Sequence, residues 1–519
     1  MFKKIVQLEL SQNKQNFINI VTAVINIAVT AVISFFLTPY IVGTLGAAAN
    51  GFVNLANNFI GYAALVKTAL DSMGSRFIMM AYYKGEHEKV KRYYSSLLFG
   101  DVILGIVMAV LSAAVIWNLE KLLNVPEHLV GDVKLLFTLV FANFIMSTVI
   151  NAWSTAPYIK NKLYLTSSTA ALSVIIRALI ILALCLSLDA RVSFVGVGTL
   201  VAGIMTCAAY YFYKRSLFPD LHISTKNFSW RTIGELVGSG IWNSISSLGS
   251  ILTNGLDLVI ANLFVGPTEM GILSISKTMP IFVMTLNENV GNAFTPSLII
   301  EYAKKRNDNI LRIIRQASKI LSIMCALPAG FLLVYGKEFY ALWQPTQNAE
   351  ALYILTVIAL IDVIVFSGMR PLYSVFTVVN KVRQSSVATI VTGVISTVIT
   401  LLMLRFTNLG IFAIAAVSVA CCFIRNIVFI IPFSAKYLGL KASTFYYVML
   451  PSVAASVIVC ICGALIKTVI SGTTWMSLIV ACAVLAVMGF CLASLLILSR
   501  ADREYLFSVI KSRLKRTTD

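Results

Sequence analysis

Charged residues are scarce in this chain of 519 residues. Asp, Glu, Lys and Arg make up 12% of it, whereas 58% of the residues are hydrophobic. Soluble domains carry roughly 25% charged residues. A soluble protein of this composition would have too little polar surface to face water. The scarcity therefore excludes a soluble enzyme, a disordered scaffold and a secreted disulfide scaffold, and it leaves a polytopic α-helical membrane protein.

Residues suited to metal binding or catalysis are also rare. The three histidines, His87, His128 and His222, lie in polar loops. None of the nine cysteines is spaced with a histidine as in a zinc site, and all of them lie in apolar segments, where cysteine acts as a small packing residue. We therefore predict no catalytic residue, no metal site and no resident cofactor.

Long polar segments are missing between the apolar blocks. A helix needs about 20 apolar residues to cross a hydrocarbon layer about 30 Å thick, and only helices satisfy their own backbone groups there. Fourteen blocks meet this requirement: 17–42, 47–82, 94–118, 130–159, 163–188, 192–213, 235–265, 268–300, 311–335, 350–379, 384–406, 409–433, 445–470 and 475–498. The first is too long for a cleaved signal peptide. Any functional site must lie among the helices.

The basic residues favour one orientation. Lys and Arg number 41 against 22 Asp and Glu. With the N-terminus inside, 29 basic residues fall in inner segments and six in outer ones. Basic loops stay cytosolic, so both termini are predicted in the cytoplasm, and the excess charge indicates topology rather than a nucleic-acid partner.

An internal repeat divides the spans. The shift that aligns Gly51 with Gly271 also aligns Tyr82 with Tyr302, Lys84 with Lys304 and Arg92 with Arg312. We therefore predict an all-α integral membrane protein of about 14 transmembrane helices, in two pseudo-symmetric six-helix lobes plus a C-terminal helix pair. The predicted parts are an N-terminal lobe (1–215), a cytosolic linker (216–234), a C-terminal lobe (235–435), the helix pair (436–498) and a basic tail (499–519), which we expect to form an amphipathic helix on the inner surface.

Ten charged side chains stand out within the predicted spans, where an unpaired charge is costly. The cations are Lys67, Arg76, Arg177, Lys277, Arg370 and Arg425, and the acids are Asp71, Asp257, Glu288 and Asp362. Arg177 and Arg425 have no acid within one helical turn. Lys67 lies four residues before Asp71, so a structural ion pair stays open for it, and Arg76 lies near an inner helix end, where it can reach the surface.

These charges predict a polar cavity for an anion. Their net charge is +2, and arginine binds phosphates through paired hydrogen bonds. The eighth span is the most polar, with Lys277 and Glu288 on nearly one face and with Pro280 and Pro296 expected to bend it. We predict that the anion binds Arg177, Lys277, Arg370 and Arg425, with Lys67 and Arg76 as secondary candidates.

Several stretches resemble a known family. They are Leu37 to Phe52, Asp71 to Arg76, Asn254 to Gly266 and Gly271 to Pro296. Over almost its whole length the chain resembles the polysaccharide-transport (Wzx-like) members of the MOP flippase superfamily, which are related to MurJ and to MATE transporters. The resemblance implies a flippase of the bacterial plasma (inner) membrane that moves a polyprenyl-pyrophosphate-linked oligosaccharide to the outer leaflet by alternating access, for a surface polysaccharide such as O-antigen or capsule.

The resemblance also implies partners. They are the lipid bilayer, the lipid-linked glycan, and the glycan polymerase and glycosyltransferases of the same pathway. Coupling to Na+ or H+ stays open, with Asp257 and Glu288 as the acids to examine first, and the polyprenyl tail is expected in lipid, against the last two spans.

Two other functions stay open. One is a cation-coupled multidrug exporter of the MATE type, although MATE exporters usually have twelve helices and an acidic binding lobe. The other is a membrane glycan polymerase or acyltransferase. The outer loops, of which the longest are near 119–130 and 336–350, are too short for such a catalytic module, so we predict that the protein is not an enzyme.

Overall fold

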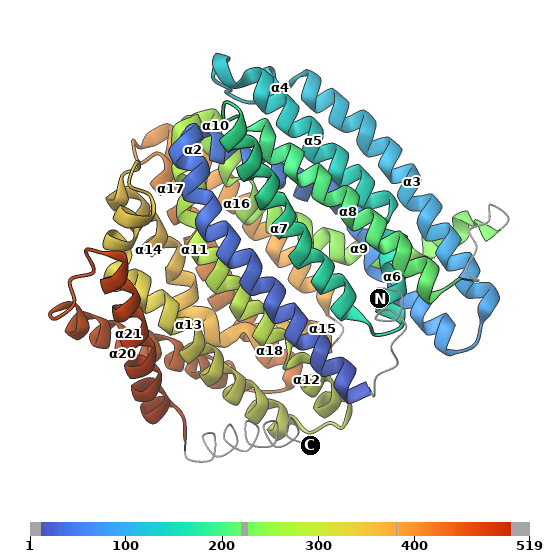
Figure 1. The fold of residues 1–519 in the computed structure, drawn as a ribbon. Helices are drawn as coiled ribbons and strands as arrows, with labels where there is room; N and C mark the ends of the chain where they lie inside the picture. The colour runs from blue at the N-terminus through green and yellow to red at the C-terminus, as the bar shows by residue number, and fades with distance from the viewer. Residues whose placement is uncertain (1–11, 220–226, 380, 500–519) are drawn as a thin grey trace. The chain divides into compact units, whose positions relative to one another are not determined.

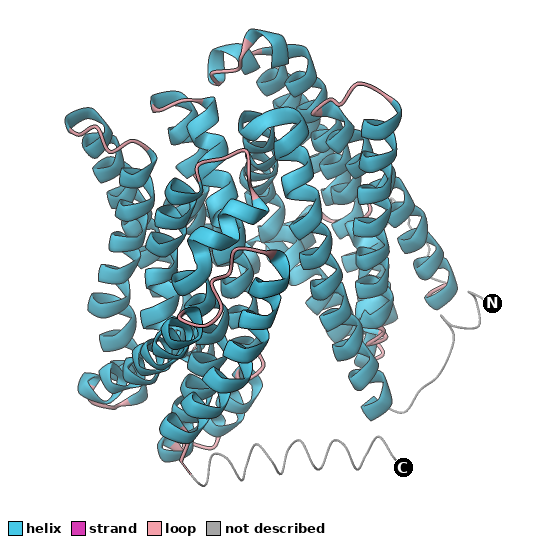
Figure 2. Cartoon of the chain, turned by 60° about the vertical axis from the view of Figure 1, so that its left-hand side comes forward, coloured by secondary structure: helices cyan, strands magenta, loops and turns pink. Residues whose placement is uncertain are grey.

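The computed structural model of the 519-residue chain describes residues 12–219, 227–379 and 381–499. These residues form helices and connecting loops, without a strand among them (Figure 2). The predicted all-α membrane fold is thereby confirmed. The expected amphipathic helix of the basic tail lies outside the described residues, and the chain divides into two compact units, Met1–Gly271 and Ile272–Asp519.

The helices of the first unit are coloured from blue to green in chain order (Figure 1). They are α2 (Gln12–Tyr83), α3 (His87–Trp117), α4 (Leu119–Leu122), η1 (Glu127–Leu129), α5 (Val130–Val149), α6 (Asn151–Ile159), α7 (Leu163–Ser187), α8 (Ser193–Leu217), α9 (Trp230–Ser250), the π-helix η3 (Ile251–Gly255) and α10 (Asp257–Phe264). α11 (Pro267–Asn292) begins in this unit and continues in the second.

The first two predicted spans form one kinked helix. α2 is 72 residues long, and Gly46 interrupts its helical geometry with φ 86° and ψ 165°. A positive φ suits glycine, which has no Cβ to clash with the backbone. The two halves of α2 on either side of Gly46 correspond to the predicted blocks 17–42 and 47–82.

The core of the first unit lies around the second half of α2. α2 packs along α3, α7 and α9, and α5 packs along α8. A buried apolar cluster that includes Leu70, Ile78, Leu97 and Leu236 joins α2, α3 and α9. α9 and α10, which the sequence assigns to the second lobe of the repeat, thus belong to the first unit by their packing.

The second unit is built around α13. Its helices are α12 (Thr295–Ala303), α13 (Asn307–Trp343), α14 (Ala349–Phe366), η4 (Ser367–Met369), α15 (Arg370–Val378), α16 (Val382–Phe406), α17 (Ile411–Arg425), the π-helix η5 (Asn426–Ile430), α18 (Ile431–Leu438), α19 (Ala442–Tyr446), η6 (Tyr447–Met449), α20 (Leu450–Lys467) and α21 (Trp475–Ile497). α13 packs against α14, α20 and α21, and α20 packs against α21. These last two helices are the predicted C-terminal pair.

The structure accounts for every predicted span. Twelve segments of the described residues are long and apolar enough to cross a membrane, and one of them, Val21–Tyr83, includes two predicted spans. α11 is not among the twelve because its asparagines and charged residues lower its hydropathy. Pro280 lies inside α11, and Pro296 stands in the first turn of α12 after a break, as expected for prolines in this span.

The bounds of the helices repeat along the chain. α3 begins at His87 and α13 begins at Asn307, which is the same shift that relates Gly51 to Gly271. α7 begins at Leu163 and α16 begins at Val382, at nearly the same shift. The predicted pseudo-symmetry of the two lobes is thus visible in the elements themselves.

Candidate functional site

The predicted intramembrane charges are divided between the two units. Lys67, Arg76, Arg177, Asp71 and Asp257 lie in the first unit, and Lys277, Arg370, Arg425, Glu288 and Asp362 lie in the second. Within each unit, the structure shows which of these charged side chains lie close to one another.

Arg370 and Glu288 form an ion pair in the second unit. Arg370 is the first residue of α15, directly after the 3-10 turn η4, and Glu288 lies near the end of α11. Their Nη1 and Oε1 atoms are 3.2 Å apart. Gly291 leaves the room for this contact, because a Cβ there would lie 2.3 Å from Cγ of Arg370.

A second polar cluster adjoins this ion pair. The Arg370 guanidinium lies 5.6 Å from the ring centroid of Tyr373. The Tyr373 hydroxyl donates to Oδ1 of the fully buried Asn426 at 2.5 Å, and Nδ2 of Asn426 donates to Oδ1 of Asp362 at 3.3 Å. Arg425 faces both Tyr373 and Asp362. The polar side chains thus extend from α11 through α15 and η5 to α14.

The charges in this polar cluster balance. Two guanidinium groups, of Arg370 and Arg425, meet two carboxylates, of Glu288 and Asp362. Opposed charges of this kind stabilise one another where water is scarce. An anion that binds either arginine must therefore compete with a carboxylate already present. Lys277 lies half-buried on the same helix as Glu288.

In the first unit, Lys67 and Asp71 form the ion pair that their spacing allows. Nζ and Oδ2 are 3.5 Å apart, and each side chain is 18% exposed. Nζ also lies 3.5 Å from the Ser147 carbonyl oxygen and 6.0 Å from the ring centroid of Phe144. Arg76, one turn and a half further along α2, is exposed.

Arg177 has a different environment. It lies in the middle of α7, and its stem packs against Gly198 of α8, where a Cβ would be 3.4 Å from Cγ of Arg177. Its Nε is buried and has no hydrogen-bond partner among the described residues, nor does any acid there form an ion pair with it. Arg177 is therefore a cation whose charge the described part of the chain does not compensate.

Asp257 is buried at the start of α10, and Leu256 separates it from the π-helix η3. The carbonyl oxygen of Gly255, at the end of η3, accepts hydrogen bonds from Tyr62 at 2.6 Å and from Asn58 at 3.1 Å. Tyr62 also lies close to Asp257. A π-turn widens the helix and frees backbone groups, which makes such turns frequent at functional sites.

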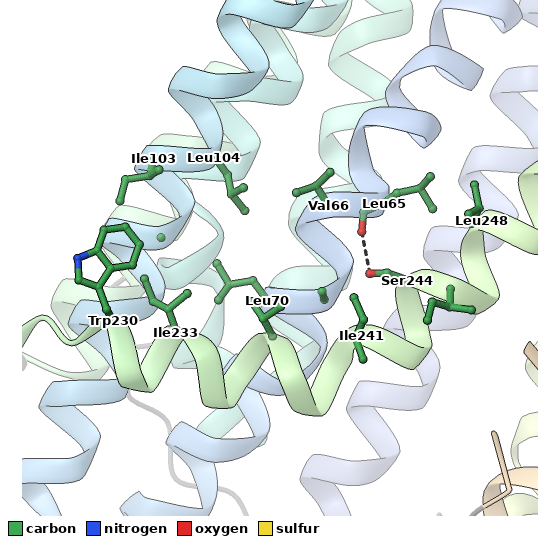
Figure 3. A pocket seen from close by; sticks show the side chains of 14 residues that line it. Leu65, Val66, Leu70, Ile103, Leu104, Trp230, Ile233, Ile241, Ser244 and Leu248 are labelled. Carbon is green, nitrogen blue, oxygen red and sulfur yellow. Dashed lines mark hydrogen bonds between the residues drawn. The ribbon is translucent and has the colours of Figure 1, made fainter. Parts of the chain in front are cut away.

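An apolar pocket opens between α2, α3 and α9 (Figure 3). Its volume is 430 Å³, and Leu65, Leu70, Ile103 and Trp230 are among the side chains that line it. The hydroxyl of Ser244 donates to the Leu65 carbonyl oxygen at 2.7 Å, which satisfies this polar group within the protein. A lining of this kind suits hydrocarbon rather than a charged group.

Sequence reasoning missed several polar residues. Asp101 was passed over within the apolar block 94–118, although it is an acid near the middle of a span. Asn151, Tyr373 and Asn426 carry no charge, and only their packing shows that they meet ionised groups. A search for every polar residue near the centre of a span would have found Asp101.

Comparison with known proteins decides the family. Residues 15–279 match the model of a family described as polysaccharide biosynthesis protein. The chain belongs to this family. Its similarity to the uncharacterized membrane protein EpsK of Bacillus subtilis (strain 168) is 26% identity over 475 residues, which cover 91% of this chain and 93% of EpsK.

Solved structures of transporters share the fold of this family member. One is a multidrug resistance MATE transporter of the MOP superfamily in its inward-facing conformation, with a TM-score of 0.65, 15% identity and coverage of 80% of this chain and 98% of that chain. Another is the lipid II flippase MurJ in an inward closed conformation, with a TM-score of 0.64, 12% identity and coverage of 91% and 98%. The family match confirms the predicted resemblance to polysaccharide biosynthesis proteins, and the two solved structures confirm the expected fold.

Proposed function

We propose that this polysaccharide biosynthesis protein is a flippase for a polyprenyl-pyrophosphate-linked oligosaccharide. It moves the lipid-linked glycan from the inner to the outer leaflet of the bacterial plasma membrane, with both termini in the cytoplasm, and supplies a surface polysaccharide such as O-antigen or capsule. The glycosyltransferases and the polymerase of the same pathway would work before and after it.

The uncompensated charge of Arg177 carries this proposal. Its Nε is buried without a partner among the described residues, and a buried polar group left without one is costly. A pyrophosphate offers several oxygens to the planar guanidinium and accepts paired hydrogen bonds from it. Arg177 would bind the head group while the polyprenyl chain stays in lipid, where the last two helices, α20 and α21, are the candidates to contact it.

The cations of the second unit would contact the head group only when the acids that face them are neutralised. Arg370 is held by Glu288, and Arg425 faces Asp362. Protonation of an acid, or its occupation by Na+, would free the arginine for a phosphate. Lys277, Lys67 and Arg76 are the remaining candidates to contact the head group, and Glu288 and Asp257 are the candidates to bind a coupling ion.

The membrane potential would favour outward movement of the anionic head group. An inside-negative potential contributes about 2.3 kcal/mol per charge per 100 mV. In alternating access, structural repeats expose a central site first to one side of the membrane and then to the other. The start positions of the helices, which recur at the repeat shift, support this mechanism. The sugars would cross in a water-filled cavity.

Reconstitution into proteoliposomes tests the proposal. A short-chain polyprenyl-pyrophosphate oligosaccharide with a fluorescent sugar is placed in both leaflets. A quencher that cannot cross the membrane is added on one side, and the decrease in fluorescence is followed. The fluorescence from the leaflet that the quencher does not reach should be lost quickly only in vesicles that contain the protein. Quenching at the rate of empty vesicles would refute the flippase function.

A parallel assay separates the multidrug alternative, which the fold shared with MATE transporters keeps in view. The same vesicles are loaded with a cationic dye. Transport of the dye without any flipping of the lipid-linked glycan would establish an exporter instead. Flipping without dye transport is the result that we expect.

A further inference from the structure

Asp101 is an acid buried near the middle of a membrane span. It lies about four turns after the start of α3, which is about 21 Å along the helix. Its side chain is 0% exposed. Neither of its carboxyl oxygens accepts a hydrogen bond from a donor in the described part of the chain.

A second acid lies beside it. The carboxyl groups of Asp101 and Asp71 are close enough to share a hydrogen bond, and the side chain of Asn151, the first residue of α6, lies beside both. Oδ1 of Asp71 is also buried and accepts no hydrogen bond from a described donor. Two carboxyl groups can share a hydrogen bond only if one of them carries a proton.

The charges near this acid pair require that proton. Lys67 forms an ion pair with Asp71 at 3.5 Å and compensates one carboxylate. The second carboxylate would leave a net charge of −1 in a buried site, where an uncompensated charge is strongly disfavoured. One bound proton makes the group of Lys67, Asp71 and Asp101 neutral.

Among the described residues, the other helices packed here bring no further charge into the site. From α5 the Ser147 carbonyl and the Phe144 ring face Lys67. On α3, Tyr94 lies two turns before Asp101, and its buried hydroxyl has no partner among the described residues. The charged residues in the first part of α9, Arg231 and Glu235, are exposed, and Glu235 accepts a hydrogen bond from Tyr93.

Hydroxyl groups continue from the acid pair toward one end of the helices. Ser75 lies one turn after Asp71 on α2, and Thr155 lies one turn after Asn151 on α6. The two hydroxyl oxygens are 3.3 Å apart, and Thr155 is 1% exposed. This hydrogen bond links the faces of α2 and α6 that carry Asp71 and Asn151.

We propose that Asp71 and Asp101 hold one exchangeable proton between them, while Lys67 compensates the charge of the remaining carboxylate. Exchange of this proton couples transport to the proton gradient. Loss of the proton leaves a second carboxylate in apolar surroundings, and α2 and α3 must then separate or admit water. The bound proton rests on the burial of the unpartnered Asp101 carboxyl and on the single cation, Lys67, beside the two acids, whereas the coupling rests on the proposed flippase function.

Carbodiimide labelling tests the bound proton without any glycan. Dicyclohexylcarbodiimide forms a stable N-acylurea with a protonated carboxyl in an apolar site, and mass spectrometry maps the modified residue. In the purified full-length protein we expect modification at Asp71 or Asp101 at about pH 6, falling roughly tenfold per pH unit above the titration of the pair. Absence of modification at both residues at low pH would overturn the proposal.

Variants of the two acids and of Lys67 give opposite expected results. In Asp71→Asn and in Asp101→Asn the remaining carboxylate pairs with Lys67, so labelling is lost. In Lys67→Met both acids need a proton, so labelling rises and persists to higher pH. Glu350→Gln, which removes an exposed acid paired with Lys337 at 3.0 Å, is the control and leaves labelling unchanged. Persistent labelling in both asparagine variants would overturn the shared proton.

Ion gradients across proteoliposomes then test the coupling. We expect a proton gradient to accelerate flipping in the wild type and not in Asp101→Asn, and a sodium gradient to have no effect. Acceleration by sodium alone, with protection of the pair from carbodiimide by sodium at constant pH, would make this a sodium site. Labelling as expected without any flipping would refute the flippase function and leave the proton site standing.

Discussion

At the scale of single residues, the intramembrane cations fall into two kinds. Arg370 and Lys67 have an acid at 3.2 Å and 3.5 Å, so their charges contribute to the packing of the protein itself. Arg177 has no such acid among the described residues. Removal of Lys67 strands the mostly buried carboxylate of Asp71, which is destabilising, whereas removal of Arg177 strands no carboxylate among the described residues.

Replacement of Arg177 by alanine should therefore leave a stable protein that exports no glycan. Arg177→Lys should restore only part of the export, because an ammonium group cannot form the paired hydrogen bonds of a guanidinium. Protein level in the membrane and surface polysaccharide are measured side by side. The control is Arg405→Ala, at an exposed arginine near the end of α16, with full export expected. A stable Arg177→Ala protein with full export would remove Arg177 from the site.

Replacement of Tyr373 by phenylalanine should destabilise the second unit by about 1 kcal/mol. The change leaves Oδ1 of the fully buried Asn426 without its donor. Thermal unfolding of the purified protein in nanodiscs measures the effect as a lower midpoint temperature. Tyr446→Phe is the matched control, because the Tyr446 hydroxyl donates to the Ile427 carbonyl oxygen on an exposed part of the surface. An equal loss in both variants would show that Tyr373 has no special role.

At the scale of helices, the two repeats break at equivalent places. α5 gives way to α6 at Asn151, and α14 gives way to α15 at Arg370, at nearly the shift that relates the two repeats. Asn151 lies beside the Asp71 and Asp101 carboxyls, and Arg370 binds Glu288. One architectural feature thus places an amide beside an acid pair in the first unit and a cation beside an acid in the second.

Close helix contact at Gly271 makes this position intolerant of a larger residue. A Cβ at Gly271 would lie 2.1 Å from the Ala47 carbonyl oxygen, and a Cβ at Gly51 would lie 3.0 Å from Cα of Gly271. Gly51 and Gly271 are also the residues that the internal repeat aligns with each other. We expect Gly271→Ala to destabilise the protein by about 1–3 kcal/mol, because backbone atoms must move apart.

The matched control for this change is Gly61→Ala. A Cβ at Gly61, on the same helix as Gly51, meets nothing within 4 Å. Alanine is the better helix former by about 1 kcal/mol, so this variant should be neutral or slightly more stable. Unfolding temperatures and expression levels of the two variants are compared. Equal stability of Gly271→Ala and the wild type would refute the close contact.

At the scale of the whole molecule, the basic loops predict the orientation in the membrane. Lys304 follows α12 and Lys121 lies in α4, and both are exposed. With cytoplasmic termini, a cysteine at position 304 faces the cytoplasm and one at position 121 faces outward. In a background without the nine native cysteines, a membrane-impermeant maleimide added to intact cells should label Lys121→Cys and spare Lys304→Cys. Labelling of Lys304→Cys from outside would reverse the predicted topology.

The sequence by itself determined the class of the protein and the positions of its spans. Lipid admits only apolar segments that satisfy their own backbone, so hydropathy locates helices residue by residue without reference to their neighbours. The repeat was also readable, since Gly51 and Gly271 reappear at the shift that the helix bounds later show. The Lys67–Asp71 ion pair was open to sequence reasoning because both residues lie on one helix face.

Only the tertiary structure decided which charges meet. Arg370 and Glu288 lie far apart in the chain, and Asp71 and Asp101 lie on different helices, so their contacts depend on how each helix is rotated about its axis and packed. The same packing places α9 and α10 in the first compact unit and leaves Arg177 without an acid among the described residues. Hydropathy reports only whether a residue suits lipid. Whether a charged residue forms an ion pair depends on the residue that lies opposite it, and only tertiary packing determines which residue that is.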